Sequence, residues 1–344
     1  MEYLKGSYKT KNNIVLNIIL FILLVILILV CLCVGKYSVS AVDCIKIIFG
    51  SIFPIEQTWS TMDQDLVMGF RFPRVIATVI VGGSLALAGA VYQGIFKNPL
   101  VSPEFLGVSS GACVGAAVAI LLALSATGIQ VFAFLGGIVA VSLTLFIPRI
   151  LRSDSNIMLV LSGIIVGGAM ASVLGFIKYI ADPATELAAI TYWQMGSFAY
   201  IDIKNLLGVM PLTLGAGIIM LAMAWWVNVL SLGEKEAQTL GVNVKIVRGI
   251  CIICSTILTA GAVCIAGTIG WVGLVIPHLG RMIAGSDNRW LLPAVCLIGG
   301  IFLLFVDTTT RIIGPAEMPI SILTGIIGAP FYAWLLYKQR MNLR

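Results

Sequence analysis

Long apolar segments constrain this chain more than any other feature of its sequence. From Ile14 to Val34 the only strongly polar side chain is Asn17. A helix needs roughly 20 apolar residues to cross a bilayer, whereas the core of a signal peptide has only about 7–15. We therefore expect a retained membrane-spanning helix here. The 344 residues are 60% hydrophobic and 10% charged, with a mean hydropathy of +1.07, which excludes an ordinary soluble globular protein.

Nine further segments have the same apolar character. We predict an all-α polytopic membrane protein with about ten transmembrane helices, folded as a single transmembrane domain over residues 1–344. The segment 271–284 is short and contains Pro277. The nine segments are 72–93, 103–124, 129–150, 157–181, 205–229, 246–268, 271–284, 290–308 and 318–337.

The basic residues predict an orientation. If residues 1–13 form a cytoplasmic N-terminal tail, 14 of the 21 Lys and Arg residues fall on the inner side and 7 on the outer side. Cytoplasmic loops carry an excess of Lys and Arg, so the count favours this orientation. Ten spans also place both termini in the cytoplasm.

Several functional classes have no support in the sequence. Neither the G-x-x-x-x-G-K-[ST] motif of nucleotide hydrolysis nor the H-E-x-x-H motif of zinc proteases occurs. Residues Gly107 to Gly111 fit G-x-S-x-G, but they lie in a helical run and not at a strand-to-helix elbow. The Cys251-x-x-Cys254 pair has no second pair, and His278 is the only histidine. We expect no metal site, no bound cofactor, no enzymatic activity and, with the +6 net charge scattered, no nucleic-acid binding.

Two predicted spans carry small residues at every fourth position. Such residues let helix backbones approach closely in lipid, where apolar burial alone favours no partner helix. The pattern predicts a tightly packed bundle. The residues are Gly82, Ala86, Ala90 and Gly94 in one span, and Gly107, Gly111, Gly115, Ala119 and Ala123 in the next.

A polar segment, residues 231–241, separates two late spans on the predicted cytoplasmic side. It begins with Ser231-x-x-Glu234, which fits a capping box, and ends at Gly241, so we predict a short helix. The segment is either a solvated connector or a docking helix that inserts into a groove of a soluble partner. The docking residues would be Leu232, Glu234, Lys235, Glu236, Ala237, Leu240 and Gly241.

Three arginines lie at the predicted outer boundary. Arg71 and Arg74 open the second span at positions i and i+3, and Arg311 follows the ninth span four residues after Asp307. Arginine at the bilayer centre costs about 2.5–3.5 kcal/mol on insertion scales, so all three belong near the interface. Snorkelling and a local Asp307–Arg311 pair explain any one of them. Three arginines together on an otherwise acidic face favour a functional role over snorkelling or a local ion pair.

Four motifs between about residue 60 and residue 337 occur in a familiar order. In them the chain resembles the FecCD family, the permease subunits of type II ABC importers for ferric siderophores, haem and cobalamin. The motifs are Arg71-Phe-Pro-Arg74 leading to Gly89-Ala-Val-Tyr-Gln93, Asn98-Pro-Leu-Val-Ser-Pro103-Glu-Phe-Leu-Gly107, Gly267 to Arg281 with Pro277-His278, and Asp307 through Arg311 and Glu317-Met-Pro319 to Gly328-Ala-Pro330.

The resemblance implies partners on both faces of a bacterial cytoplasmic (inner) membrane. A cytoplasmic ATPase dimer, which uses ATP and Mg, would bind residues 231–241 as a coupling helix. An external substrate-binding protein would present acidic residues to Arg71, Arg74 and Arg311. A second permease subunit, identical or a paralogue, would complete the pathway.

By resemblance the fifth span and its neighbours line that pathway, although helix packing explains the same residues equally well. The implied function is import of an iron chelate by alternating access, with ferric siderophore ahead of haem and cobalamin. The alternative is a secondary transporter or channel. Such proteins usually carry ionisable residues at mid-membrane, and we expect no acidic residue in the middle of a span here. The pathway candidates are Ser155, Asn156, Ser162, Gly163, Gly167 and Lys178.

Overall fold

The computed structural model describes residues 2–51, 53–152, 155–313 and 317–341, and within these ranges it is helical with no strand. The elements are α1 (Glu2–Cys33), α2 (Ala41–Gly50), α3 (Thr61–Gln64), the π-helix η1 (Asp65–Arg71), α4 (Phe72–Ile95), the 3-10 helix η2 (Pro103–Leu106), α5 (Val108–Leu121), α6 (Ala126–Ile150), α7 (Asn156–Ile180), α8 (Glu186–Met195), α9 (Ile203–Ala222), α10 (Ala224–Leu232), α11 (Glu234–Thr239), α12 (Val244–Ala266), α13 (Val272–Ala284), α14 (Asn288–Ile312) and α15 (Ile320–Met341).

The predicted all-α fold is confirmed. Seven helical segments in the described part of the chain are long and apolar enough to cross a membrane, and α5, α13 and α15 are shorter apolar helices. Each of these corresponds to one of the ten predicted spans. Of these short helices, α5 and α13 begin inside the bundle, as described below.

Two boundaries differ from the prediction. Residues 2–13 are helical and continue α1, whose apolar span begins at Asn12; a cytoplasmic location for them stays a prediction. The predicted span 205–229 consists of two helices, α9 and α10, which meet at Met223. The Asn228 side chain donates to Asp287 and accepts from the Asn288 backbone at 2.8 Å. These contacts tie α10 to the start of α14.

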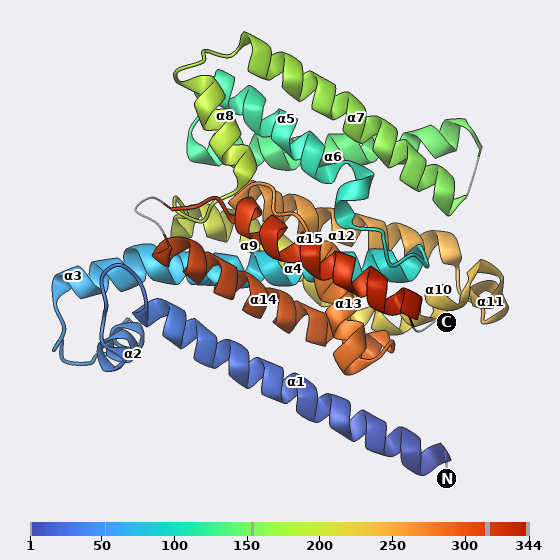
Figure 1. Cartoon of the computed structure of the whole chain (residues 1–344), viewed down its shortest axis with the longest axis horizontal. Helices are drawn as coiled ribbons and strands as arrows, with labels where there is room; N and C mark the ends of the chain where they lie inside the picture. Colours follow the sequence, from blue (N-terminus) through green and yellow to red (C-terminus); the bar gives the residue numbers. More distant parts are fainter. Residues whose placement is uncertain (1, 52, 153–154, 314–316, 342–344) are drawn as a thin grey trace.

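Helix α4 lies at the centre of the bundle, surrounded by α9, α12, α13 and α14 (Figure 1). Its predicted face of small residues makes these contacts close. A methyl group on Gly82 would overlap the carbonyl oxygen of Gly299 in α14, and one on Gly89 would overlap that of Gly273 in α13. The predicted close approach of helix backbones is therefore confirmed.

A second layer consists of α5, α6 and α7, with α8 across its end (Figure 1). Gly111 of α5 and Gly136 of α6 approach so closely that a methyl group on either would overlap the other's carbonyl oxygen. Helix α1 packs on the other side of α14, through Leu24, Leu32 and Leu304. The two sets of small residues at every fourth position, one on α4 and one on α5, thus allow close packing in the two layers of helices.

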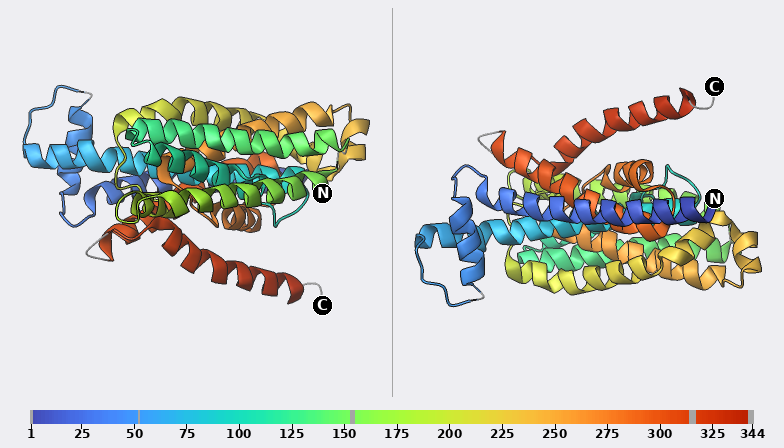
Figure 2. Two further views of the ribbon diagram at one scale, coloured as in Figure 1. Left: turned by 90° about the horizontal axis from the view of Figure 1, so that it is seen from above. Right: turned by 90° about the horizontal axis from the view of Figure 1, so that it is seen from below.

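The two ends of the bundle carry different polar elements. We call them the α3 end, where α4 begins and α14 terminates, and the α11 end, to which the beginning of α1 and the end of α15 both point (Figure 1). The C-terminal half of α15 leaves the body of the molecule (Figure 2). Its Trp334 and Tyr337 side chains are exposed.

The α4–α14 contact should be sensitive to a single methyl group. We expect Gly299→Ala to lower stability by about 1–3 kcal/mol, because overpacking against backbone atoms cannot be relieved by a side-chain rotation. The matched change Gly215→Ala in α9, where nothing lies within 4 Å, should gain up to about 1 kcal/mol of helix propensity. Thermal unfolding of the purified variants measures both. Equal shifts would contradict the proposed contact.

Candidate functional site

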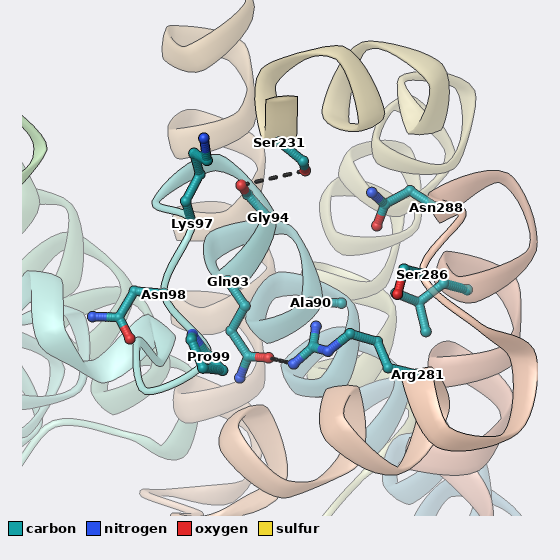
Figure 3. Close-up of a pocket in the computed structure, with 11 residues that line it drawn as sticks. Ala90, Gln93, Gly94, Lys97, Asn98, Pro99, Ser231, Arg281, Ser286 and Asn288 are labelled. Atoms are coloured by element: carbon teal, nitrogen blue, oxygen red, sulfur yellow. Dashed lines mark hydrogen bonds between the residues drawn. The ribbon is translucent and has the colours of Figure 1, made fainter. Parts of the chain in front are cut away.

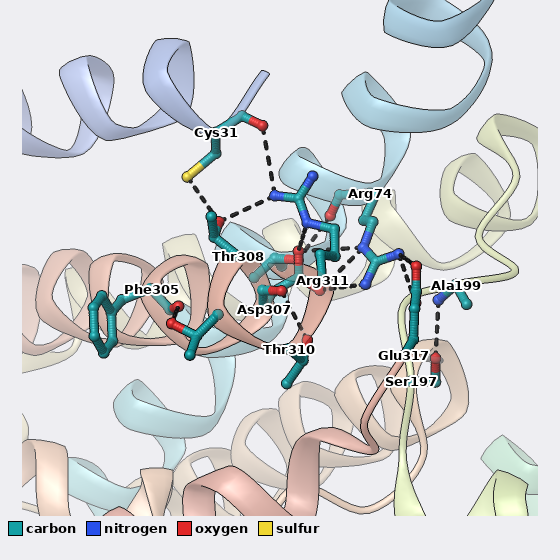
Figure 4. A network of polar contacts seen from close by, with 12 residues as sticks. Cys31, Arg74, Ser197, Ala199, Phe305, Asp307, Thr308, Thr310, Arg311 and Glu317 are labelled. Carbon is teal, nitrogen blue, oxygen red and sulfur yellow. Dashed lines mark hydrogen bonds and ion pairs between the residues drawn. The ribbon is translucent and has the colours of Figure 1, made fainter. Parts of the chain in front are cut away.

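At the α3 end, Arg74 connects three segments that are distant in the sequence (Figure 4). Its Nε and Nη2 donate to Asp307 of α14 at 3.0 and 2.8 Å, and its Nη1 donates to Glu317, before α15, at 2.8 Å. The Asp307 side chain is 0% exposed and that of Glu317 is 38% exposed. Arg74 therefore has one inaccessible and one accessible carboxylate partner.

Arg311 binds the same buried carboxylate. Its Nε lies 3.3 Å from Oδ2 of Asp307, four residues earlier on α14, so the predicted local pair is confirmed. Its Nη2 donates to Thr308 at 3.0 Å and to the Cys31 carbonyl of α1 at 3.5 Å. Asp307 thus holds two guanidinium groups, and Glu317 supplies the second negative charge that balances them.

Arg71 uses backbone acceptors instead. Its Nη1 donates to the carbonyl oxygens of Leu32 and Cys33 at 2.7 and 3.0 Å, and its Nη2 donates to that of Tyr37. The first two acceptors lie at the C-terminal end of α1, where the helix dipole favours a cation. Arg71 consequently fastens α1 to the start of α4.

The sequence correctly predicted that the three arginines share one end of the bundle, but not their surroundings. Arg71, Arg74 and Arg311 are only 6–8% exposed, and each already has acceptors within the chain. Contact with a partner's acidic residues stays a prediction, and for Arg74 it would require exchange of a carboxylate. Sequence reasoning missed Glu317 as a ligand of Arg74, since 243 residues separate the two.

At the α11 end, the predicted capping box is wrong. Ser231 belongs to α10, and its hydroxyl donates to the Val227 carbonyl at 2.7 Å and the Gly94 carbonyl at 3.4 Å (Figure 3). Gly233, with φ of +142°, separates α10 from α11, which has no side-chain cap at its start. Gly241 does end the segment as predicted, because its φ is +76° and its N–H donates to the Gln238 carbonyl.

Helix α11 has a buried and an exposed side. Ala237 is fully buried, whereas Leu232 and Leu240 at its two ends are 57% and 58% exposed. Glu234 pairs with Arg248 of α12, and Lys235 and Glu236 are exposed. The residues predicted to dock a partner are thus on the surface, apart from Ala237, which holds α11 to its own chain.

Polar contacts tie α11 to the core. Lys97, just after α4, donates to the Leu232 carbonyl at 2.7 Å. A cavity of about 220 Å³ lies beside this bond, and on its other wall Arg281 of α13 donates to the Gln93 side chain of α4 (Figure 3). Helix α4 therefore contacts both the α11 hinge and the end of α13.

Two of the six predicted pathway residues on α7 serve helix contacts. Ser162 is fully buried and donates to the Met158 carbonyl at 2.7 Å. A methyl group on Gly163 would overlap the Phe105 carbonyl of η2. These two positions therefore favour the alternative of helix packing.

The other four predicted residues are spread along α7. Gly167 lies half-buried near Gly107, and Lys178 donates to the Gln194 side chain at 2.6 Å. Ser155 precedes α7 and is exposed. Asn156 is the first residue of α7, and its side chain lies outside what the structure describes. Their place on a pathway stays a prediction.

A second cavity, of about 290 Å³, lies between η2, the start of α13 and the middle of α4. Glu104 and Trp271 both line it. The expectation that no acidic residue lies in the middle of a span stays a prediction, since Glu104 lies in η2 and not in the middle of a long helix. The predicted span 103–124 places Glu104 at a membrane surface, whereas η2 and the shortened α5 place it inside the bundle.

The comparisons with known proteins agree with this architecture. Residues 23–338 match the profile of the FecCD transport family. The chain is 39% identical over 307 residues to the molybdate import system permease protein MolB of Haemophilus influenzae, covering 89% of this chain and 90% of the relative. It is 39% identical to the hemin transport system permease protein HmuU of Yersinia pestis, covering 82% of this chain and 87% of that one.

The chain belongs to the FecCD transport family. A solved structure described as a metal-chelate type ABC transporter in an inward-facing conformation matches with a TM-score of 0.84 at 38% identity, over 94% of this chain and 98% of the other. The chain is thus an ABC transporter permease that spans a membrane. This membership favours an ABC permease over the secondary transporter or channel considered from sequence alone.

The two carboxylates bound to Arg74 should contribute unequally to stability. Asp307→Asn leaves the buried Arg311 without a carboxylate partner and Arg74 with Glu317 alone, so we expect a loss of about 3–5 kcal/mol. Glu317→Gln removes a partly solvated partner and should cost at most about 1 kcal/mol. Thermal unfolding of the purified variants tests this, with Arg289→Gln at the exposed Arg289–Asp287 pair as a control that should change little. Similar losses for Asp307→Asn and Glu317→Gln would refute the ranking.

Proposed function

We propose that this chain is the permease subunit of an ATP-driven, binding-protein-dependent importer that works by alternating access. The single observation that carries the proposal is the family match along nearly the whole chain, with relatives described as import permeases. We expect an iron chelate as cargo, ferric siderophore ahead of haem or cobalamin, and the molybdate relative adds an oxyanion to that set. ATP and Mg would be used by a separate ATPase dimer.

The α11 end would face the cytoplasm and the α3 end the outside. Of the Lys and Arg residues, 14 of 21 fall on the α11 side in the ten-span topology. A second permease subunit, identical or a paralogue, would pack beside this one in the inner membrane. The exposed apolar side chains on α7, among them Ile165 and Phe176, offer surface for that subunit or for lipid.

Helix α11 with its flanking residues would be the coupling helix for the ATPase. Two exposed leucines, Leu232 and Leu240, bracket a short polar helix on the side away from the buried Ala237. Exposed apolar residues that flank charged ones suit insertion into a groove of a soluble protein. Lys97 and Arg248 hold the helix against α4 and α12, so a push on α11 would reach the transmembrane core.

The exposed leucines should be required for binding the ATPase. We expect Leu232→Asp together with Leu240→Asp to abolish co-purification of the ATPase, because a carboxylate would have to be buried in the partner's groove. The permease itself should keep its unfolding temperature, since both side chains are exposed.

The matched control is Tyr200→Asp. Tyr200 is 93% exposed between α8 and α9, far from α11. This variant should keep the ATPase bound. An intact complex with the doubly substituted α11 segment would refute the docking role, and loss of the complex in both variants would point to a non-specific effect.

The α3 end would receive the substrate-binding protein by exchange of a carboxylate. Glu317 is the accessible partner of Arg74, while Asp307 is buried under both arginines. An acidic side chain of the binding protein can therefore replace Glu317 without unfolding the network. Glu317 precedes α15, so the exchange would also free the start of that helix.

This exchange predicts that removing a charge at the interface strengthens binding of the partner instead of weakening it. We expect Glu317→Gln to tighten binding of the binding protein several-fold, because the internal competitor for Arg74 becomes neutral. Arg74→Gln should weaken binding. Both are measured by titrating the binding protein onto the permease complex in nanodiscs. If Glu317→Gln leaves the affinity unchanged, Arg74 acts only within the chain.

A further inference from the structure

The cavity at Glu104 lies about half-way through the bundle. Its wall includes Leu85 of α4. At 1.5 Å per residue, Leu85 is about 16 Å along the helix from Arg74 and about 15 Å from Ile95. Since α4 traverses the bundle from the α3 end to the α11 end, the cavity lies near the middle of the membrane.

One short helix, α13, begins at this cavity, and a second, α5, begins just after the η2 turn that lines it. Helix α5 has 14 residues and α13 has 13, so each is about 20 Å long and too short to cross the hydrocarbon core of about 30 Å. The chain before each is irregular: η2 precedes Gly107, and residues 267–271 are unwound. Irregular backbone is tolerated at this depth only where protein buries it or where it lines a water-filled cavity. Paired interruptions of this kind mark binding sites in transporters.

Glu104 is the single ionisable side chain among the ten residues that line the cavity. Its carboxylate has no ion pair or hydrogen bond within the described residues. The residue has exposed surface on the cavity, although protein atoms surround its carboxyl group on most sides. Gly270 also lines the cavity, and a Cβ atom there would lie 3.8 Å from Oε1 of Glu104. The indole of Trp271 forms part of the same wall.

We infer that Glu104 makes this cavity a cation-favouring position on the cargo route, so that the transporter takes neutral or positively charged cargo in preference to oxyanions. This rests on the proposed importer function. A carboxylate beside an aromatic ring suits ammonium groups and other positive surfaces. A chelate that presents amine or hydroxyl donors fits it, and a free oxyanion does not.

Among the residues that line the cavity, the start of α13 supplies the opposing charge. A helix N-terminus carries roughly half an elementary positive charge, and Val272 and Gly273 open α13 beside the cavity. This half charge at the start of α13 stabilises the ionised form of Glu104 but does not cancel its full negative charge. The net field at the cavity is therefore negative when Glu104 is ionised.

A cysteine at position 270 places a reporter thiol next to Glu104. Gly270→Cys is sterically open, because only the Glu104 carboxylate lies within 4 Å. We would measure the rates at which this thiol reacts with a cationic and an anionic methanethiosulfonate reagent of similar size. The complex is assayed in nanodiscs, without nucleotide and with ATP plus vanadate, and peptide mapping separates residue 270 from the native cysteines.

The cationic reagent should react faster, and the ratio of the two rates should fall on the order of tenfold when Glu104→Gln is added, because opposite unit charges a few ångströms apart attract strongly. The matched control is Tyr200→Cys, an exposed position away from the cavity. Its rate ratio should not change with Glu104→Gln. An unchanged ratio at position 270 would refute the charge assignment. No labelling by either reagent in either condition would refute access from water.

A transport assay separates this inference from the proposed function. In proteoliposomes, Glu104→Gln should raise uptake of molybdate relative to a cationic ferric siderophore several-fold. If the labelling result holds while neither cargo is taken up with ATP, the importer proposal fails and the charge of the cavity stands. If both are taken up but their ratio is the same with and without Glu104, the selectivity inference fails alone.

Discussion

Close contact between helix backbones around α4 is the condition on which the rest of this structure depends. Lipid tails are as apolar as leucine, so burial alone does not hold helices together in a membrane, and van der Waals contact must do so. Gly82 against Gly299 and Gly89 against Gly273 bring carbonyl groups into contact with the facing helix. These contacts fix α13 and α14 to α4, and the polar groups at both ends can form only because that alignment is held.

The same helix connects the two ends of the molecule. Arg74 in the first turn of α4 holds the buried Asp307, and Gln93 and Lys97 at its other end contact Arg281 and the α11 hinge. A conformational change driven by partners requires that each partner favour a different state. A continuous helix with a charge network at one end and a hinge contact at the other can pass such a preference between its ends.

The parts of this fold that could be predicted are those set by the bilayer itself. Apolar length locates the helices because the hydrocarbon thickness dictates it, and Arg71, Arg74 and Arg311 could be placed at one end because a charge at the bilayer centre is costly. Contacts between distant residues could not be predicted. Ser231 looked like a helix cap, yet it bonds to Gly94, and the partners of Arg74 lie more than 200 residues away.

Glu104 shows why depth in the membrane is harder to predict than the number of helices. A short helix preceded by an irregular turn has the same apolar length as a span that starts at the surface, so the two are indistinguishable in sequence. Relatives with 39% identity are described as carrying molybdate or hemin, which differ in charge and size. With a common fold and shared close contacts in the core, such differences must come from the few side chains that face the route. Of these, a charged side chain among apolar ones at mid-membrane acts on the cargo over the longest distance, because little water is present there to screen its charge.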